Sequence, residues 1–488
     1  MSGGFRSRAA GRRQPKRNAE ETGTQPRRAP KSKRSQAEQR DQTGTRVSIG
    51  DPAREAAWEV LLRVAQDGAF ANLTLPALLR ERRISGRDAA FATELTYGAL
   101  RSLGVLDAVI ADCASRSLGA MAPEVLAALR LGAYQLLYTR VEQHAAVDTA
   151  VRLVQAAGHE HAKGFANAVL RTISRTPADQ WMDKLAPKDD LAGLAFRTAH
   201  PEWIARSFRE ALGEAELEQA LTADSERPVV HLVARPGEIS AEELALATGG
   251  EEGKYSPYAV YLEQGDPGKL EPVRDGLASV QDEGSQLIAR AVASVPVDSD
   301  QGRWLDLCAG PGGKAALMGA LAAIDGARVD AVEVSDHRSA LIRKAVAGLP
   351  VEVRTADGRS PGLEPGYDRV LVDAPCSGLG ALRRRPEARW TKSEDDIAEL
   401  TTLQSELLAS AIELVKPGGV VVYSTCSPDV RETRGVVDKA LGAGKVEELD
   451  AREFVNGMDN VGDGPSVQMW PHRHGTDAMF FSVLRKLG

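Results

Sequence analysis

The stretch RWLDLCAGPGGKAALMGALAAIDGARVDAVEV, residues 303–334, sets the expected fold of the C-terminal half of the chain. It contains an apolar strand-like run, a glycine-rich loop, a helical pattern and a second apolar run. Apolar strands that alternate with helices indicate a mostly parallel sheet covered by helices on both faces. The alternation continues to GGVVVYSTC at 418–426. Residues 291–488 are therefore predicted to form a doubly wound, Rossmann-like α/β domain that binds ligands at the carboxyl ends of its strands.

The chain ahead of this domain divides into four regions by composition and periodicity. Residues 1–50 hold 13 Lys or Arg against 4 Asp or Glu and few large apolar side chains, so we expect a disordered basic tail. Apolar residues recur at helical spacing through 51–178, which predicts an all-α domain. Residues 179–227 are interpreted as a helical linker. Short β-like runs then predict a small α/β subdomain over 228–290.

Length and composition exclude several classes of protein. A chain of 488 residues with 43% hydrophobic and 26% charged residues is typical of a soluble protein of several domains. No run reaches the roughly 20 apolar residues of a membrane span, and the first residues lack the apolar core of a secretory signal, so we expect a cytoplasmic protein. The four cysteines show no CxxC spacing, which argues against disulfides and metal and predicts free thiols.

The glycine-rich loop DLCAGPGGKA, residues 306–315, allows three interpretations. A phosphate-binding P-loop requires Gly where Cys308 stands and Ser or Thr where Ala315 stands, so that interpretation fails. A dinucleotide fingerprint fits formally, with Glu333 as the ribose partner. S-adenosylmethionine binding uses the same loop without a pyrophosphate. Glu333 and Asp357 end successive predicted strands, so one could hold the ribose and the other the adenine amino group; the alternative is two solvated acids.

Two of the four cysteines, Cys376 and Cys426, end predicted neighbouring strands, and each is followed by Ser. Carbon 5 of a pyrimidine is a poor nucleophile, so its methylation requires a thiolate that adds to carbon 6. A second group beside the methyl donor must then take part in removing the carbon 5 proton and releasing the thiol. A single buried cysteine is more often a packing residue, but two at strand ends favour this chemistry. The piece Asp373-Ala374-Pro375-Cys376 also departs from the Asn/Asp-Pro-Pro-Tyr/Phe motif of amino-directed methyltransferases.

Several motifs of the chain resemble one family, the RNA 5-methylcytosine methyltransferases of the NOL1/NOP2/Sun group. In the α/β half they are LDLCAGPGGK (305–314), VLVDAPCSGLG (370–380), VKPGGVVVYSTCS (415–427) and HGTDAMFF (474–481). In the helical half FATELTYGALR (91–101), LRLGAYQLLY (129–138) and AAVDTAVRLVQ (145–155) resemble the NusB-like RNA-binding domain of the bacterial Sun type. The resemblance covers about residues 52–486 and leaves out the basic tail.

The resemblance implies a role for individual residues. The cysteine of the Thr-Cys motif is the nucleophile in that family, which assigns the role to Cys426, and the Pro-Cys cysteine, Cys376, assists product release. The S-adenosylmethionine site implied by the family comprises Cys308, Ala309, Gly310, Pro311, Gly312, Gly313, Lys314, Glu333, Asp357 and Asp373. The implied activity is methylation of a cytosine carbon 5 in RNA, with 16S ribosomal RNA or a small-subunit assembly particle as substrate, by a monomer.

Two other interpretations of the chain remain open. One is a non-catalytic RNA-binding factor of ribosome assembly, which leaves the intact cysteines and acids unexplained. The other is a dinucleotide-dependent oxidoreductase, which leaves both cysteines unexplained. Near the Pro-Cys motif, LRRRPEARW at 382–390 supplies four arginines that suit phosphate contacts, and Trp390 is expected in the core rather than on a base.

Overall fold

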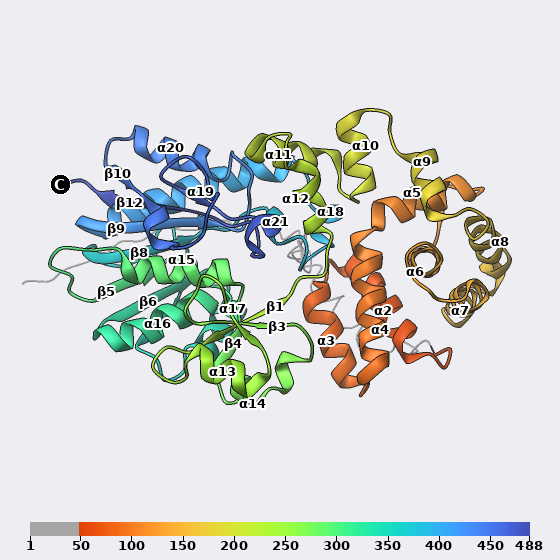
Figure 1. The fold of residues 1–488 in the computed structure, drawn as a ribbon, viewed down its shortest axis with the longest axis horizontal. Coiled ribbons are helices and arrows are strands. Elements are labelled where there is room, and N and C mark those ends of the chain that lie inside the picture. The colour runs from red at the N-terminus through yellow and green to blue at the C-terminus, as the bar shows by residue number, and fades with distance from the viewer. Residues whose placement is uncertain (1–47) are drawn as a thin grey trace, which may run out of the picture. The chain divides into compact units, whose positions relative to one another are not determined.

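The computed structural model describes residues 48–488 (Figure 1). Most of the predicted basic tail, residues 1–47, lies outside the described residues. The first part of the described chain is helical. Its helices are α2 (Pro52–Asp67), α3 (Ala71–Glu81), α4 (Gly86–Arg101), α5 (Leu103–Cys113), α6 (Pro123–Tyr138), α7 (Gln143–Ala156) and α8 (Lys163–Ile173). This is the all-α domain that the apolar periodicity predicted.

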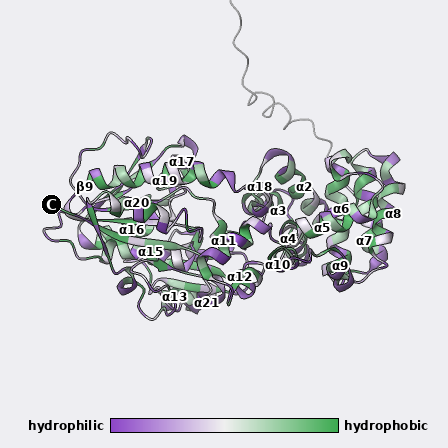
Figure 2. Cartoon of the chain, turned by 90° about the horizontal axis from the view of Figure 1, so that it is seen from above, coloured by the Kyte–Doolittle hydropathy of each residue, from purple (hydrophilic) through white to green (hydrophobic). Residues whose placement is uncertain are grey.

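Local signals in the sequence fix where the first helix begins and ends. The Asp51 side chain accepts a hydrogen bond from the backbone N–H of Arg54 at 3.0 Å, and Pro52 occupies the first turn, where its missing N–H costs nothing. Gly68 ends α2 in the left-handed conformation, with φ 64°. The buried face of α2 packs on α4 and α6 around one core. Helices here carry hydrophobic and hydrophilic residues along their length, as expected for helices with one face on a core (Figure 2).

Four helices and a small sheet connect this domain to the C-terminal half. The helices are α9 (Ala178–Leu185), α10 (Asp190–Arg197), α11 (Glu202–Leu212) and α12 (Leu217–Asp224). The sheet is antiparallel, in the order β2-β3-β1-β4, from β1 (Val230–Ala234), β2 (Glu251–Glu252), β3 (Ala259–Leu262) and β4 (Ala278–Val280). Its helices are α13 (Ala241–Thr248), which begins with a capping box of Ser240 and Glu243, and the short α14 (Glu271–Arg274).

The C-terminal half is built on a large sheet in the order β10-β12-β9-β8-β5-β6-β7. Its strands are β5 (Arg303–Asp306), β6 (Arg328–Glu333), β7 (Val351–Thr355), β8 (Tyr367–Asp373), β9 (Val415–Thr425), β10 (Val446–Leu449) and β12 (Phe480–Lys486), with β11 (Val467–Gln468) paired to β12. The five strands β5 to β9 are parallel; β12 is antiparallel to β9, and β10, at the edge, is antiparallel to β12. The mostly parallel sheet predicted from the sequence is confirmed.

Helices cover both faces of this sheet. They are α15 (Glu283–Ser294), α16 (Gly313–Asp325), α17 (Asp336–Ala345), α19 (Asp395–Leu414) and α20 (Arg434–Gly442). The short α18 (Ala388–Thr391) and α21 (Pro471–His474) lie near α11 and α12 instead. Strand residues alternate between two cores: Val420 and Val422 pack with residues of α15 and α16, whereas Val421 and Tyr423 pack with residues of α19 and α20. Successive strand side chains point to opposite faces, so continuous apolar runs fill both cores.

Among the described residues, no helix combines the length and the apolar character that crossing a membrane requires.

Candidate active site

The residues predicted from the sequence gather at one edge of the large sheet. Cys308 follows β5, Glu333 ends β6, Asp357 follows β7, Asp373 ends β8 and Cys426 follows β9. These five strands are parallel neighbours, so their carboxyl ends share an edge. The edge is the one at which open α/β sheets bind ligands.

The two thiols that lie 50 residues apart in the sequence meet at this edge. Strands β8 and β9 are paired, with Asp373 opposite Ser424, so the residues just beyond each strand are adjacent. The Sγ atoms of Cys376 and Cys426 lie 3.3 Å apart, within hydrogen-bond distance for sulfur. Both side chains are partly exposed. A ligand at the sheet edge can therefore reach either sulfur.

The surroundings of the two sulfurs shift their pKa values in opposite directions. The hydrogen bond from Cys376 is the main cause that lowers the pKa of Cys426; burial opposes it, and the Lys314 ammonium lowers this pKa further. The same hydrogen bond, burial and the charges on Cys426 and Glu432 raise the pKa of Cys376 well above its usual range. Of the two thiols, Cys426 is therefore the one that ionises more readily, and Cys376 is the one that more readily keeps its proton.

Lys314 is tied into the thiol site by Asp373. Its Nζ donates to Asp373 Oδ2 at 2.9 Å, and the Ser424 hydroxyl donates to Asp373 Oδ1 at 3.0 Å. Burial disfavours the Lys314 ammonium, but the Asp373 charge and hydrogen bond outweigh it, so its pKa is raised. A fixed positive charge therefore stands beside Cys426, whereas the sequence assigned Lys314 only to the donor loop.

The backbone of the glycine-rich loop lies so close to neighbouring residues that two of its positions have no room for a side chain. A Cβ at Gly310 would lie 2.1 Å from Glu333 Oε2, and a Cβ at Gly312, where φ is 114°, would lie 3.1 Å from Ile342 Cα. Gly312 also precedes α16 without any side chain that caps it. The loop backbone thus lies directly against the acid that ends β6, and the start of α16 is available to a negatively charged group.

Two buried oxygens beside the loop lack a partner among the described residues. Asp306 accepts a hydrogen bond from the Cys308 N–H through Oδ1, but its Oδ2 has none; Gln281 Oε1 has none either, and its side chain is 3.8 Å from the Cβ position of Gly313. Burial, and then the Asp373 charge, raise the pKa of Asp306 to about 7. Oxygens of this kind suit a ligand that carries N–H donors, such as the amino-acid end of S-adenosylmethionine. No sequence pattern pointed to Gln281, which lies at the end of the small sheet.

Asp357 is at the expected edge, but Arg359 engages its carboxylate. The guanidinium donates to both carboxylate oxygens, at 2.6 to 3.1 Å, and holds the pKa of Asp357 at about 2. The pair lines a hollow of about 580 Å³ together with Ser360 and Glu406. An adenine amino group would have to share Asp357 with Arg359, a partner that the sequence did not indicate.

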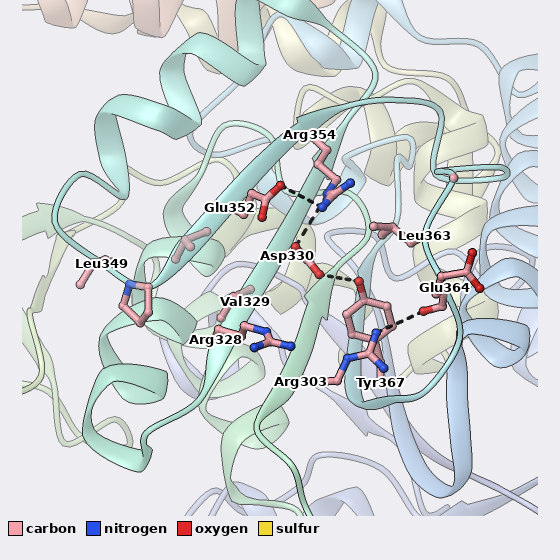
Figure 3. A pocket seen from close by; sticks show the side chains of 13 residues that line it. Arg303, Arg328, Val329, Asp330, Leu349, Glu352, Arg354, Leu363, Glu364 and Tyr367 are labelled. Carbon is pink, nitrogen blue, oxygen red and sulfur yellow. Dashed lines mark hydrogen bonds and ion pairs between the residues drawn. The ribbon is translucent and has the colours of Figure 1, made fainter.

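A larger hollow, of about 770 Å³, lies at the opposite end of the strands (Figure 3). Arg303, Asp330, Arg354 and Tyr367 line it, and their charges are largely paired within the wall: Arg354 bridges Glu352 and Asp330, and the Tyr367 hydroxyl donates to Asp330. It contains none of the predicted site residues. The size of a hollow therefore does not locate the chemistry in this molecule.

Three of the four arginines that follow the Pro-Cys motif are bound to groups of the protein itself, so the expected phosphate contacts are wrong for these three. Arg383 and Arg384 are paired with Asp282 and Asp477, and Arg389 is fully buried. Burying a guanidinium requires such partners. As expected, Trp390 is structural: its indole N–H donates to the Leu100 carbonyl at 2.7 Å, and its ring lies against Gly104.

No group of three or more His, Cys, Asp or Glu within residues 48–488 is arranged to hold a metal ion.

Comparison with known proteins identifies relatives over most of the chain. A family model described as 16S rRNA methyltransferase RsmB/F matches residues 293–485, and the NusB family model matches residues 51–175. A Mycobacterium tuberculosis protein that bears the name of a methyltransferase is 57% identical over 90% of this chain and 97% of its own length. The "probable ribosomal RNA small subunit methyltransferase B" of Bacillus subtilis is 32% identical over 89% of this chain and 99% of its own. The crystal structure of PH0851, 23% identical, shares the fold with a TM-score of 0.78 over 91% of this chain and all of that one.

Proposed function

The chain belongs to the RsmB/F family of 16S rRNA methyltransferases, and from this premise we propose that it transfers a methyl group from S-adenosylmethionine to carbon 5 of a cytosine in small-subunit ribosomal RNA. The observation that carries the proposal is the pair of sulfurs 3.3 Å apart beside the glycine-rich loop. Methylation at a pyrimidine carbon needs one thiolate and one proton-bearing partner. Methylation of an exocyclic amine needs neither.

Cys426 is the nucleophile in this proposal. Its lowered pKa favours the thiolate, which adds to carbon 6 of the cytosine, and the electron pair moves to carbon 5. Carbon 5 then bonds to the methyl group, loses its proton to a base, and the Cys426–carbon 6 bond breaks. S-adenosylmethionine, when bound, supplies the electrophilic methyl group.

Cys376 assists the last step. Its thiol lies within hydrogen-bond distance of the departing sulfur and, because its pKa is raised, still carries a proton to donate in that hydrogen bond. A hydrogen bond to the thiolate stabilises the leaving group. Loss of Cys376 should therefore slow release more than attack.

The donor is proposed to lie along the loop from Cys308 to Lys314, with Glu333 toward the ribose and Asp357 toward the adenine. Asp373 connects the two halves of the site, since it holds Lys314 beside Cys426. Asp306 Oδ2 and Gln281 Oε1, the unpartnered oxygens, would receive the donor's ammonium group. The close approach of Gly310 to Glu333 brings the loop and the acid proposed for the ribose into one site.

Trapping on RNA that contains 5-fluorocytosine tests the assignment, because fluorine at carbon 5 cannot leave as a proton and the adduct persists. We expect wild type and Cys376→Ala to form a denaturant-stable RNA adduct, and Cys426→Ala to form none. On ordinary RNA, only Cys376→Ala should accumulate adduct. Cys113→Ala, in the helical half, is the matched control. An adduct with Cys426→Ala would refute the assignment, and a wild type that binds RNA but forms no adduct would favour a non-catalytic assembly factor.

A further inference from the structure

The serines that follow the two cysteines are joined to a buried carboxyl group from a third segment. The Ser377 and Ser427 hydroxyls lie 3.1 Å apart. Glu432, fully buried, accepts the Ser377 hydroxyl through Oε2 and the Ser377 backbone N–H through Oε1 at 2.8 Å. Glu432 is six residues beyond Cys426, so it links the Thr-Cys segment to the Pro-Cys segment.

Both chain neighbours of Cys376 are held by this network. The Gln404 amide, from α19, donates to the Pro375 carbonyl at 2.9 Å and to Glu432 Oε1 at 3.0 Å. The backbone of Glu432 is held in turn by the Tyr423 hydroxyl, which donates a hydrogen bond to the Glu432 carbonyl at 2.7 Å. Because Pro375 and Ser377 are fixed from either side, the backbone of Cys376 has little freedom to move its sulfur away from Cys426.

The network also holds a carboxyl group that no cation pairs with among the described residues. Every donor to the Glu432 carboxyl is a neutral group, a serine or an amide, and no Lys, Arg or His pairs with it in residues 48–488. The nearby Asp429, in contrast, is paired with Arg431 at 2.8 Å. The groups that act on Cys376 are Cys426, Glu432 and Asp373, and all of them raise its pKa. The Lys314 ammonium, in contrast, lowers the pKa of Cys426.

We propose that Glu432 is a positioning residue that fixes Cys376 against Cys426 and keeps Cys376 in the proton-bearing form. The inference rests on the proposed function, since it assigns Glu432 to the product-release step. The two sulfurs are thereby distinguished by their neighbours: the Glu432 carboxyl holds the residue after Cys376, whereas Lys314, held by Asp373, acts on Cys426. Nothing in the chemistry of the two side chains alone would separate their roles.

Alkylation of the free enzyme by iodoacetamide tests the proposal without RNA. We expect Glu432→Gln, which keeps the shape and removes the charge, to lower the pKa of Cys376 and raise its alkylation rate constant at pH 8 roughly tenfold, about one pKa unit. Peptide mass spectrometry identifies the modified cysteine. Glu283→Gln is the matched control, since Glu283 is also fully buried and accepts two backbone N–H groups and one hydroxyl. An unchanged Cys376 profile in folded Glu432→Gln, or the same change in Glu283→Gln, overturns the proposal.

A second variant tests the positioning separately and does not require Glu432→Gln to fold. Ser377→Ala removes the hydroxyl that links Glu432 to Ser427, so disulfide formation between Cys376 and Cys426 with diamide should slow several-fold. Ser482→Ala, which removes another buried serine that donates to a glutamate, should leave that rate unchanged. Equal rates in Ser377→Ala and wild type contradict the proposal.

Adduct lifetime connects the network to catalysis. Glu432→Gln should accumulate an adduct on ordinary RNA, as Cys376→Ala does, while still forming an adduct on 5-fluorocytosine RNA. If wild type forms no adduct on 5-fluorocytosine RNA, the proposed function fails. The alkylation and disulfide measurements, which need no RNA, still show whether Glu432 affects Cys376. If wild type forms an adduct and Glu432→Gln releases it at the wild-type rate, the inference fails alone.

Discussion

Cys376 and Cys426 are the same side chain in two electrostatic settings. Lys314, held by Asp373, favours the charged form of Cys426, while Glu432 disfavours the charged form of Cys376. Because the sulfurs are 3.3 Å apart, the ionisation of one affects the other, and the surrounding charges favour ionisation at Cys426 over Cys376. The division of labour between nucleophile and release group thus follows from residues other than the cysteines.

Removing the ammonium of Lys314 should make the Cys426 thiol harder to ionise. Lys314→Met is expected to raise the pKa of Cys426, because the positive charge is lost while Asp373 remains. The thiolate then forms only at higher pH, so the pH profile of Cys426 alkylation moves upward by about one unit, and the rate at pH 7 falls about tenfold. Methyl transfer should show the same upward shift.

Lys416→Met is the control for this experiment. Lys416 is paired with buried Asp368 at 2.6 Å at the start of β9, the opposite end of the same strand from Cys426. Loss of the Lys416 ammonium should leave the pH profile of Cys426 alkylation unchanged. A Lys314→Met enzyme whose Cys426 profile matches wild type would show that the lysine does not activate the nucleophile.

At the scale of elements, the segment after the Pro-Cys loop connects three parts of the molecule. Arg383 and Arg384 join it to Asp282 at the start of α15 and to Asp477 before β12. Arg389, in α18, donates to backbone carbonyls and to Asp224 at the end of α12. An arginine-rich stretch that looks like an RNA contact in sequence is therefore an internal support for the active-site loop.

Arg389→Met distinguishes these two roles. The substitution leaves Asp224 and His200 buried without the guanidinium, so the free energy of unfolding should fall by about 3–5 kcal/mol, as measured by urea denaturation. Arg385→Met, which removes a partly exposed guanidinium stacked 4.7 Å from the Phe70 ring, should change it by no more than about 0.5 kcal/mol. Unchanged stability together with weaker RNA binding by Arg389→Met would restore the phosphate-contact interpretation.

At the scale of the whole described molecule, the helical domain contacts the catalytic half through a few specific groups. Glu387 accepts the Ala71 N–H at 3.3 Å, and Trp390 donates to Leu100. Both residues belong to the segment that follows the Pro-Cys loop. The helical domain is thus joined by hydrogen bonds to the segment that supports the Pro-Cys loop.

Removal of residues 1–47 tests whether the basic tail contacts RNA. Each Lys or Arg near phosphate releases counterions, and the first 50 residues hold 13 such side chains against 4 acids, while the rest of the chain is acidic. The truncated enzyme should bind RNA more weakly, and its log–log salt slope should be flatter by about 0.7 for each phosphate that the tail neutralises in the full chain. Titration with S-adenosylmethionine should show the same affinity as the full chain. An unchanged salt slope would mean that the tail does not contact phosphate.

Much of the candidate site could be predicted because strand ends are local features. The apolar runs before Glu333, Asp373 and Cys426 mark where each strand stops, and parallel pairing then brings those ends to one edge. Asp306 and Gln281 were missed because their importance lies in unpartnered buried oxygens, which only packing creates. Arg359 was missed because a side chain two residues from Asp357 can point to solvent or turn back equally well.

The sequence by itself determined the order of helical and α/β domains, the parallel sheet and the placement of both cysteines at strand ends. Hydrophobic periodicity and glycine positions set these features, since they act over a few residues and repeat many times along the chain. Only the tertiary structure decided that Glu432 binds Ser377 next to Cys376, that Lys314 is paired with Asp373 and that Arg389 is buried. Such pairings join residues far apart in the chain, and they depend on ångström-scale packing that no local pattern encodes.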